Sequence, residues 1–313
     1  MDVILIVLGI ALLYVGGEFL VRNSSRLAQH WGISPLVIGL TIVAFGTSAP
    51  ELAASLTAAL RGSSELALGN VVGSNIANIA LILALTTLVY PLRTDANFVR
   101  REMPFMIGSA ALLLLFSLLN DTLGRFHGLL LLALLAVYLW VLFSRQESAE
   151  TQREFEKEYT GKPLLAPWRS VFGGLLGLGL LVGGAQLLVA GATSLARGFG
   201  VPELIIGLTL VAVGTSLPEL STSIVAATKR EPDIALGNIV GSNIFNILFI
   251  LGATATVQPL TVPYAAVAPD LWVMLALSLL LVPFLVTGSR LGRREGGVLL
   301  ALYGVYVAYL YLS

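Results

Sequence analysis

The chain has 313 residues, of which 57% are hydrophobic and only 12% are charged, and its mean hydropathy is +0.90. A soluble domain carries about a quarter charged residues, so this chain cannot cover the surface of a water-soluble globule. The composition argues against a soluble enzyme, a nucleic-acid binder and a disordered scaffold, and it favours a polytopic membrane protein whose main partner is the lipid bilayer. Eighteen basic and 18 acidic residues give a net charge of 0. The lack of cysteine excludes disulfides and thiolate metal sites, and two histidines, His30 and His127, argue against a histidine metal centre.

Ten apolar runs are long enough to cross a bilayer, which takes roughly 20 apolar residues per helix. We therefore predict an all-α polytopic membrane protein with ten transmembrane helices and short connections. The first run has no basic segment before it and no convincing cleavage site, so we expect a retained helix rather than a signal peptide. The predicted crossings are 3–21, 34–60, 66–90, 103–119, 126–144, 170–195, 204–228, 234–258, 268–287 and 296–312.

The basic residues predict the orientation, because Lys and Arg are concentrated in the cytoplasmic loops of membrane proteins. With the N-terminus outside, the inward loops hold 15 Lys and Arg residues and the outward loops hold three, Arg61, Arg125 and Arg197. We therefore expect both termini outside. The longest hydrophilic stretch, 145–169, contains five Glu and five Lys or Arg and is predicted to be a cytoplasmic linker.

The two halves of the chain repeat one another. Without a gap, 28 of 48 positions are identical between 32–79 and 200–247, an offset of 168 residues. The matched residues include Gly, Thr, Ser, Pro, Glu and Asn, so the likeness is more than a shared apolar composition. Residues 36–52 read LVIGLTIVAFGTSAPEL against LIIGLTLVAVGTSLPEL at 204–220, and 67–79 read ALGNVVGSNIANI against ALGNIVGSNIFNI at 235–247.

This repeat divides the chain into three parts. Residues 1–144 form a first five-helix repeat with its motif at 36–79, 145–169 form the linker, and 170–313 form a second five-helix repeat with its motif at 204–247. Because five is odd, the second half enters the membrane from the opposite side. Inverted repeats of this kind place the substrate near the midplane, where the two copies meet.

Two acids, Glu51 and Glu219, lie deep inside predicted crossings at equivalent positions of the two halves. An ionised carboxylate in hydrocarbon costs at least ~2.5 kcal/mol, so each should face a cavity or a partner. No basic residue lies inside any predicted crossing, which leaves protonation or a bound cation. A cation shared by the two acids is the simpler explanation.

The residues before each acid also favour a cation site. Pro50 cannot donate the backbone hydrogen bond of a regular helix and Gly46 loosens the turn, so carbonyl oxygens are freed. Thr47 and Ser48 lie four and three residues before Glu51, near its face. Residues 214–219 repeat the pattern as GTSLPE. Oxygen ligands without Cys or His favour Ca²⁺, Na⁺ or Mg²⁺ over zinc or copper.

The helices that follow carry polar stripes at i, i+4 and i+8. Of these, we assign Ser74, Asn78, Ser242 and Asn246 to the ion site. Interhelical hydrogen bonding is the main role expected for Asn70, Asn75, Asn238 and Asn243. Glu18, four residues before Arg22, is expected to be a paired acid that reaches towards the membrane surface.

The motifs GTSAPE, GTSLPE, GSNIAN and GSNIFN resemble those of the Ca²⁺/cation antiporter superfamily, specifically the prokaryotic sodium/calcium exchangers. The resemblance extends over the whole chain in topology. It implies a location in the plasma (inner) membrane of a prokaryote, transported Ca²⁺ and Na⁺ with no cofactor, and no obligate protein partner. It also implies that the first and sixth helices slide as a pair across the others.

The resemblance further implies the ligands of four clustered cation sites, which include metal-binding carboxylates at Glu51 and Glu219. The Ca²⁺ site would comprise Glu51, Glu219 and the backbone oxygens of Thr47 and Thr215. The Na⁺ sites would comprise Ala212, Thr215, Ser216, Glu51 and Ser74 in one set, Ala44, Thr47, Ser48, Glu219 and Ser242 in the inverted set, and Asn78 and Asn246 between them.

The chain departs from its relatives at Asn246, where several of them have Asp. The two carboxylates that remain give a formal site charge of −2. This charge balances one Ca²⁺, whereas three Na⁺ would leave one positive charge uncompensated. A protonated Asp has nearly the shape of Asn, so exchange need not be lost. An acid at this position accompanies potassium dependence, so Asn246 argues against K⁺ co-transport.

The main hypothesis is antiport of Ca²⁺ against Na⁺ by alternating access, because the empty, doubly charged site should resist crossing the membrane. The first alternative is a proton-coupled antiporter of the same fold, since two clustered glutamates can carry protons. Lower alternatives are a cation channel and a scaffold that does not transport. The sequence contains no HExxH motif, aspartyl pair or Ser–Lys dyad, so we do not expect an enzyme.

Overall fold

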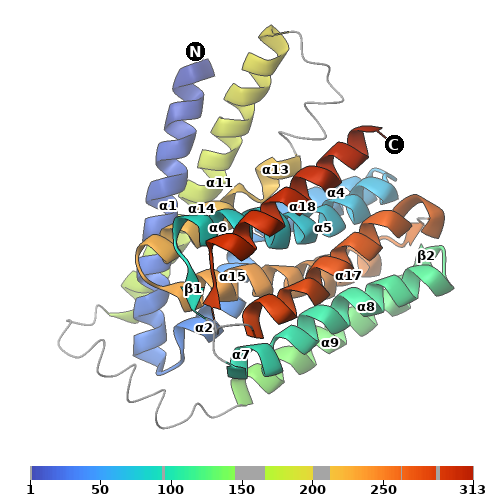
Figure 1. Ribbon diagram of the computed structural model, residues 1–313, viewed down its shortest axis with the longest axis horizontal. Coiled ribbons are helices and arrows are strands. Elements are labelled where there is room, and N and C mark those ends of the chain that lie inside the picture. The colour runs from blue at the N-terminus through green and yellow to red at the C-terminus, as the bar shows by residue number, and fades with distance from the viewer. Residues whose placement is uncertain are drawn as a thin grey trace.

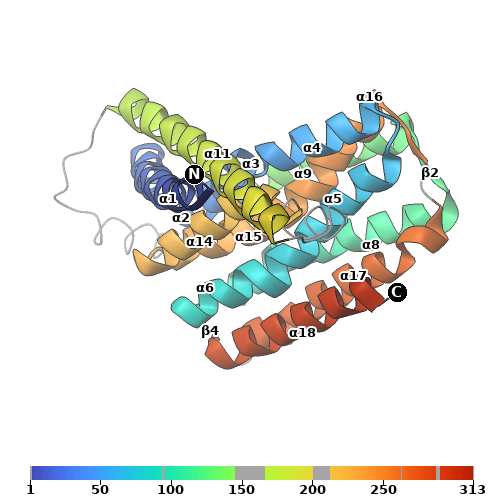
Figure 2. The ribbon, with the colours of Figure 1, turned by 90° about the horizontal axis from the view of Figure 1, so that it is seen from above.

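The computed structural model describes residues 2–93, 96–144, 166–199, 212–261, 263–286 and 290–312. The described chain is almost entirely helical (Figures 1 and 2). The first half contains α1 (Asp2–Trp31), α2 (Pro35–Ile38), η1 (Gly39–Val43), α3 (Ala44–Thr47), α4 (Ala49–Leu60), α5 (Ser64–Ala77), η2 (Asn78–Leu83), α6 (Ala84–Val89), β1 (Leu92–Arg93), α7 (Ala96–Arg101), α8 (Met103–Leu119), β2 (Thr122–Leu123) and α9 (Arg125–Ser144). The second half contains α11 (Pro167–Gly198), α13 (Ala212–Thr215), α14 (Leu217–Thr228), α15 (Pro232–Phe245), η4 (Asn246–Leu251), α16 (Gly252–Val257), β3 (Leu260–Thr261), α17 (Tyr264–Val286), β4 (Arg290–Leu291) and α18 (Arg293–Leu312).

Seven helices of the described chain are long and apolar enough to cross a membrane, and a bent pair raises this number to eight. The bent pair joins Pro35–Thr47 to Ala49–Leu60 at 44°. Of the other predicted crossings, 204–228 begins outside the described residues and 296–312 falls within α18. The fold is therefore a multi-pass helical membrane fold, and the count of ten crossings stays a prediction.

The two halves repeat the same elements at the offset found in the sequence. Examples are α4 and α14, α5 and α15, and α9 and α18, whose bounds differ by 168 residues at both ends. The short strands join the halves, because β1 pairs antiparallel with β4, and β2 with β3. Their registers are Leu92↔Leu291 and Thr122↔Thr261. Each strand pair therefore contains one strand from the first repeat and one from the second.

The second repeat supplies the central helix. Along α15 every residue from Ile234 to Phe245 is buried, including its polar residues. Helix α5 is buried over much of its length, whereas α1 and α11 expose many apolar side chains. Figures 1 and 2 show α1 and α11 side by side and steeply inclined to the remaining helices. The structure thus consists of a packed bundle and an outer helix pair.

The predicted end of the first crossing at residue 21 was wrong, because α1 continues to Trp31. The apolar run ends at Arg22, but Asn23, Ser24 and Ser25 are buried and the helix continues through them. The Asn23 amide donates to the Phe19 carbonyl, 2.7 Å away, so its polar group is satisfied within the helix. Arg22 and Arg26 therefore lie on a helix and not in a loop. The linker predicted at 145–169 lies mostly outside the described residues, and α11 begins at Pro167.

The outer helices α1 and α11 approach one another through glycines. A Cβ atom added at Gly16 would lie 2.7 Å from the Leu181 nitrogen and 2.8 Å from the Gly177 oxygen. Gly9 and Gly184 make the equivalent contact farther along. Since residues early in α1 face residues late in α11, the two equivalent helices run antiparallel. Small residues at such an interface allow close packing of helices in a membrane.

We predict that Gly16→Ala destabilises the protein by about 1–3 kcal/mol, because the added methyl group meets backbone atoms that cannot move aside alone. The measurement is thermal unfolding of the detergent-solubilised protein. Gly108→Ala is the control, since a Cβ atom at Gly108 on α8 meets nothing within 4 Å. Equal melting temperatures for the two variants would contradict the prediction.

Candidate cation-binding site

The centre of the bundle contains two broken helices, one in each repeat. Helix α3 ends at Thr47 and α4 begins at Ala49, so Ser48 lies at the break with φ −81° and ψ 5°. Ser216 lies at the equivalent break between α13 and α14 with φ −93° and ψ 6°. A proline follows each break by two residues and cannot donate a helical hydrogen bond. The break that the sequence predicted at Gly46 and Pro50 is therefore confirmed.

Glu51 and Glu219 lie in the first turns of α4 and α14, directly after these breaks. Their side chains are 1% and 0% exposed. The two breaks meet one another, because Ser48 bonds to Glu219 and Ser216 bonds to Glu51. Both acids are therefore taken out of water into the same region of the bundle, where like charges must be compensated.

Hydrogen bonds between the repeats hold the two acids. The Ser48 hydroxyl donates to Glu219 Oε1 and the Ser216 hydroxyl donates to Glu51 Oε1, each over 3.0 Å. Each serine thus binds the acid of the other repeat. A serine in a regular helix would lie on the same helix face as the acid three residues later. The crossed bonds therefore depend on the two breaks meeting one another in the fold.

Besides the hydroxyl groups of Ser25, Thr193, Thr222 and Thr254, five buried oxygen atoms on the two acids and on other predicted ligands have no hydrogen-bond partner among the described residues. Buried polar atoms in proteins are nearly always paired, so a cluster of unpaired oxygens requires an explanation. A bound cation would satisfy them, because it needs only electron-pair donors. These atoms are Glu51 Oε2, Glu219 Oε2, Asn78 Oδ1, Asn246 Oδ1 and Ser242 Oγ.

No basic side chain among the described residues forms an ion pair with Glu51 or Glu219. The ion pair of Glu18 is with Lys229 at 2.6 Å, and the predicted neighbour Arg22 is not its partner. The described residues also contain no cluster of three His, Cys, Asp or Glu that could hold a metal. A cation here would therefore be held by two carboxylates and neutral oxygens.

The other predicted ligands lie close to the acids or in the same short helices. Ser74 Oγ is 3.5 Å from Ser216 Oγ, which joins Ser74 to the Glu51 side. The Thr47 hydroxyl is buried and donates to Asn238 Oδ1 over 3.1 Å. Ala44 begins α3 and is buried, and Thr215 ends α13 and is half-buried. Ala212 begins α13, and the structure describes only its backbone.

Two asparagines fix the acid-bearing helices, as the sequence predicted. Asn70 on α5 donates to the Glu51 carbonyl at 3.3 Å and to Ser55 Oγ at 2.9 Å. Asn238 on α15 makes the equivalent bonds to the Glu219 carbonyl at 3.3 Å and to Ser223 Oγ at 3.0 Å. Sequence reasoning missed Ser55 and Ser223. The repeat could have revealed them, because each is a serine four residues after its acid.

Asparagines also connect the two repeats near the acids. Asn246 Nδ2 donates to Asn75 Oδ1 over 3.1 Å, and Asn75 Nδ2 donates to the Asn243 carbonyl over 3.4 Å. The Asn243 amide, by contrast, bonds within its own helix to Ile239. Asn78 and Asn246 begin the π-helical segments η2 and η4. Such segments are frequent at functional sites, and nothing in the sequence predicted them here.

Sequence reasoning also missed a second pair of equivalent acids, Glu102 and Asp270. Tyr138 on α9 donates to Glu102 Oε2 over 3.2 Å, and Tyr306 on α18 donates to Asp270 Oδ1 over 2.9 Å. Glu102 is only 4% exposed. These tyrosines join α9 to the residue that precedes α8, and α18 to α17.

Comparisons with known proteins identify the family of the chain. The sequence model of the sodium/calcium exchanger protein family matches residues 1–144 and 169–312. The chain is 40% identical over 314 residues to the putative antiporter CaxA of Alkalimonas amylolytica, covering 99% of this chain and 97% of the relative. It is 39% identical over 317 residues to the inner membrane protein YrbG of Escherichia coli, with 98% and 96% covered.

A solved structure of the sodium-calcium exchanger NCX_Mj, soaked with Na⁺ and without Ca²⁺, superimposes with a TM-score of 0.80 at 32% identity, and 98% of each chain is covered. The matches extend over both repeats, as the sequence motifs indicated. The chain therefore belongs to the sodium/calcium exchanger protein family and is an integral, multi-pass membrane protein.

Proposed function

We propose that this protein exchanges Ca²⁺ for Na⁺ across the membrane by alternating access, with the ions bound between Glu51 and Glu219. The observation that carries the proposal is the pair of buried acids, each with one unpaired carboxylate oxygen and no basic partner among the described residues, together with the unpaired oxygens of Asn78, Asn246 and Ser242. Family membership supports an antiporter of small cations. Nothing in the site favours an enzyme over a transporter.

The chemistry of the cluster favours hard cations. Ca²⁺ prefers carboxylate, carbonyl and amide oxygens, which are the atoms that the site presents. Two carboxylates carry a formal charge of −2, so one Ca²⁺ neutralises them. Because Na⁺ uses the same oxygens, the two ions compete for one charge-compensating position. An empty site retains two buried charges, which disfavours its movement across the membrane and enforces exchange.

We assign individual ligands on the same basis. Glu51 and Glu219, with the backbone oxygens of Thr47 and Thr215, form the Ca²⁺ site. Ser74 and Ser216 complete a Na⁺ position on the Glu51 side. Its counterpart on the Glu219 side uses Ser48 and Ser242, whose hydroxyl is buried and unpaired. Ala44, Ala212, Asn78 and Asn246 supply the remaining oxygens.

We further propose ten crossings arranged as two inverted halves, 1–144 and 170–313. The antiparallel packing of α1 against α11 supports inversion, because these helices occupy equivalent positions in the repeats. The reciprocal strand pairs support it too. The 15 to 3 distribution of basic residues supports an orientation with both termini outside and residues 145–169 in the cytoplasm. In the inner membrane of a prokaryote with an inward Na⁺ gradient, the direction is Ca²⁺ export.

We predict that Glu51→Gln and Glu219→Gln each abolish Na⁺-gradient-driven uptake of ⁴⁵Ca²⁺ into proteoliposomes, because each substitution removes half of the site's compensating charge. Glu65→Gln is the matched control, since Glu65 is exposed in the first turn of α5. Normal uptake by either site variant would refute the assignment of the acids.

The coupling ion can be determined separately. A proton-coupled antiporter of the same fold would take up Ca²⁺ in response to a pH gradient in Na⁺-free buffer. We predict that a pH gradient alone drives no Ca²⁺ uptake. A Na⁺ gradient applied in its place should drive uptake. Equal uptake under both conditions would favour proton coupling, and Ca²⁺ flux without any counter-ion would indicate a channel.

A further inference from the structure

Helix α1 is attached to α14 by two polar contacts made by residues outside the proposed cation ligands. Lys229, the residue that follows α14, donates to Glu18 Oε1 over 2.6 Å. The Ser221 hydroxyl donates to the Leu13 carbonyl over 2.7 Å. We call these contacts the α1–α14 latch, formed by Glu18, Lys229, Ser221 and Leu13.

The other repeat has no equivalent of this latch. At the offset of 168 residues, Glu18 corresponds to Gln186 and Lys229 to Arg61. Gln186 carries no charge and cannot form an ion pair with Arg61. Ser221 corresponds to Ala53, which has no hydroxyl group to donate to Leu181, the counterpart of Leu13. The two halves are therefore alike at the cation site and different at this contact.

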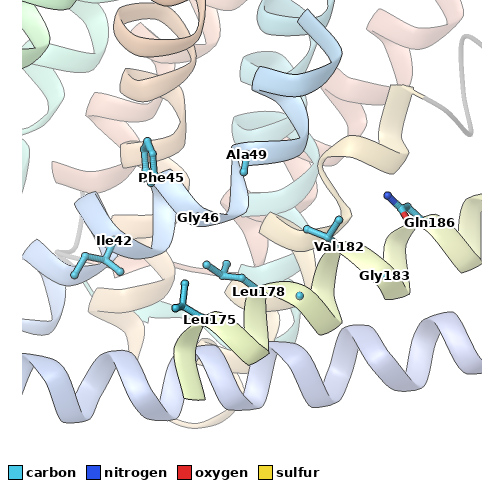
Figure 3. Close-up of a pocket in the computed structure, with 10 residues that line it drawn as sticks. Ile42, Phe45, Gly46, Ala49, Leu175, Leu178, Val182, Gly183 and Gln186 are labelled. Carbon is cyan, nitrogen blue, oxygen red and sulfur yellow. The ribbon is translucent and has the colours of Figure 1, made fainter. Parts of the chain in front are cut away.

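A groove also lies beside α11, the counterpart of α1, and Gln186, the counterpart of Glu18, is one of the residues that line it. This groove of about 650 Å³ lies between α11 and the segment formed by η1, α3 and the start of α4. In Figure 3 the side chains of Leu178, Val182 and Gln186 on α11 point towards that segment. On the α1 side, a Cβ atom added at Gly17 would lie only 3.2 Å from the Val225 side chain on α14. Helix α11 also contacts the bundle closely at one point, because a Cβ atom added at Gly46 would lie 2.7 Å from the Leu178 side chain, and the groove lies beside that contact.

We propose that the α1–α14 latch biases the protein towards the access state seen here, with α1 closed on α14 and the groove beside α11 open. This inference rests on the proposed function. In a transporter built from inverted repeats, the second access state exchanges the roles of the two halves. A contact shifts such an equilibrium only if it forms in one state and not in the other. The latch meets this condition because Gln186 and Ala53 cannot reproduce it in the exchanged state.

The orientation proposed from the basic residues places Lys229 on the cytoplasmic side. The latch therefore holds the cytoplasmic side closed in this state. The Lys229 and Glu18 side chains are 35% and 38% exposed, so water screens their attraction. An exposed ion pair of this kind changes an equilibrium constant by up to about fivefold. A single hydrogen bond contributes about twofold to tenfold. The latch therefore shifts the equilibrium between the two access states moderately and leaves both states accessible.

The test is a distance measurement between spin labels on α4 and α11. The chain has no cysteine, so Leu60→Cys and Leu195→Cys introduce the only two labelling sites. Leu60 ends α4 and is 62% exposed, and Leu195 lies near the end of α11 and is 36% exposed. Double electron–electron resonance in lipid nanodiscs, at fixed Na⁺ and Ca²⁺ concentrations, measures the ratio of open-groove to closed-groove populations.

We expect Glu18→Gln to lower this ratio by about twofold to fivefold, and Ser221→Ala to lower it by about twofold to tenfold. The double variant that carries both Glu18→Lys and Lys229→Glu reverses the ion pair and should restore the ratio. This result would show that the ion pair, and not a general loss of packing, causes the change in the single variant. Gln186→Glu should also lower the ratio, because it allows an ion pair with Arg61 in the opposite state. Ala54→Ser on α4 is the control, since it adds a hydroxyl group outside the latch.

An unchanged ratio in Glu18→Gln with Ser221→Ala, or a charge exchange that fails to restore the ratio, would overturn the latch. The latch proposal would also be wrong if the measurement gave one distance population that stayed the same in every variant. These outcomes are distinct from failure of the proposed function, because the distance measurement requires no ion flux. Normal ⁴⁵Ca²⁺ exchange together with an unchanged ratio would refute the latch alone.

Discussion

The rest of the structure depends on the burial of two carboxylates without a basic partner among the described residues. Burial removes the water that would stabilise their charge, and the crossed serine bonds bring the two acids into one region of the bundle. The fold supplies one hydroxyl donor to each acid and leaves the second oxygen of each unpaired. This arrangement is incomplete without a positive charge. The broken helices, the asparagine supports and the central position of α15 all serve to hold these oxygens in place.

Duplication accounts for how a short chain builds such a site. One acid on one helix would need several different neighbours, whereas two copies can supply ligands to one another. Ser48 binds the acid of the second repeat and Ser216 binds the acid of the first, so neither half is complete alone. The same reciprocity occurs at the strand pairs. The α1–α14 latch is the exception, and an unequal contact is what gives two otherwise equivalent states different energies.

The described helices fall into two groups that are held by different kinds of contact. The buried helices α5 and α15 are joined by side-chain hydrogen bonds to the acid-bearing helices, which fixes the ligands. The outer helices α1 and α11 instead contact one another through glycine backbones that offer few directional bonds. The two outer helices are therefore held to one another by close backbone packing and not by directional bonds.

The printed sequence was most informative where the repeat made a residue's equivalent visible. Glu51, Glu219 and the helix breaks beside them could be predicted because a buried acid and a helical proline are costly and appear at matching positions. The supporting serines and the acids Glu102 and Asp270 were missed, because small polar residues and helix-end acids occur commonly without special roles. The end of α1 was misplaced because hydropathy measures lipid exposure, while Asn23 and its neighbours are buried against protein.

By itself, the sequence determined the membrane class, the repeat, the two central acids and the oxygen chemistry of the candidate site, because composition and spacing are local properties of the chain. Only the tertiary structure decided which serine binds which acid, which oxygens remain unpaired, where the π-helical segments begin and which outer helix is closed on the bundle. These features depend on contacts between residues more than 100 positions apart. Their geometry follows from how the two repeats pack together. The sequence of a repeated motif does not by itself show how the two copies are placed relative to one another.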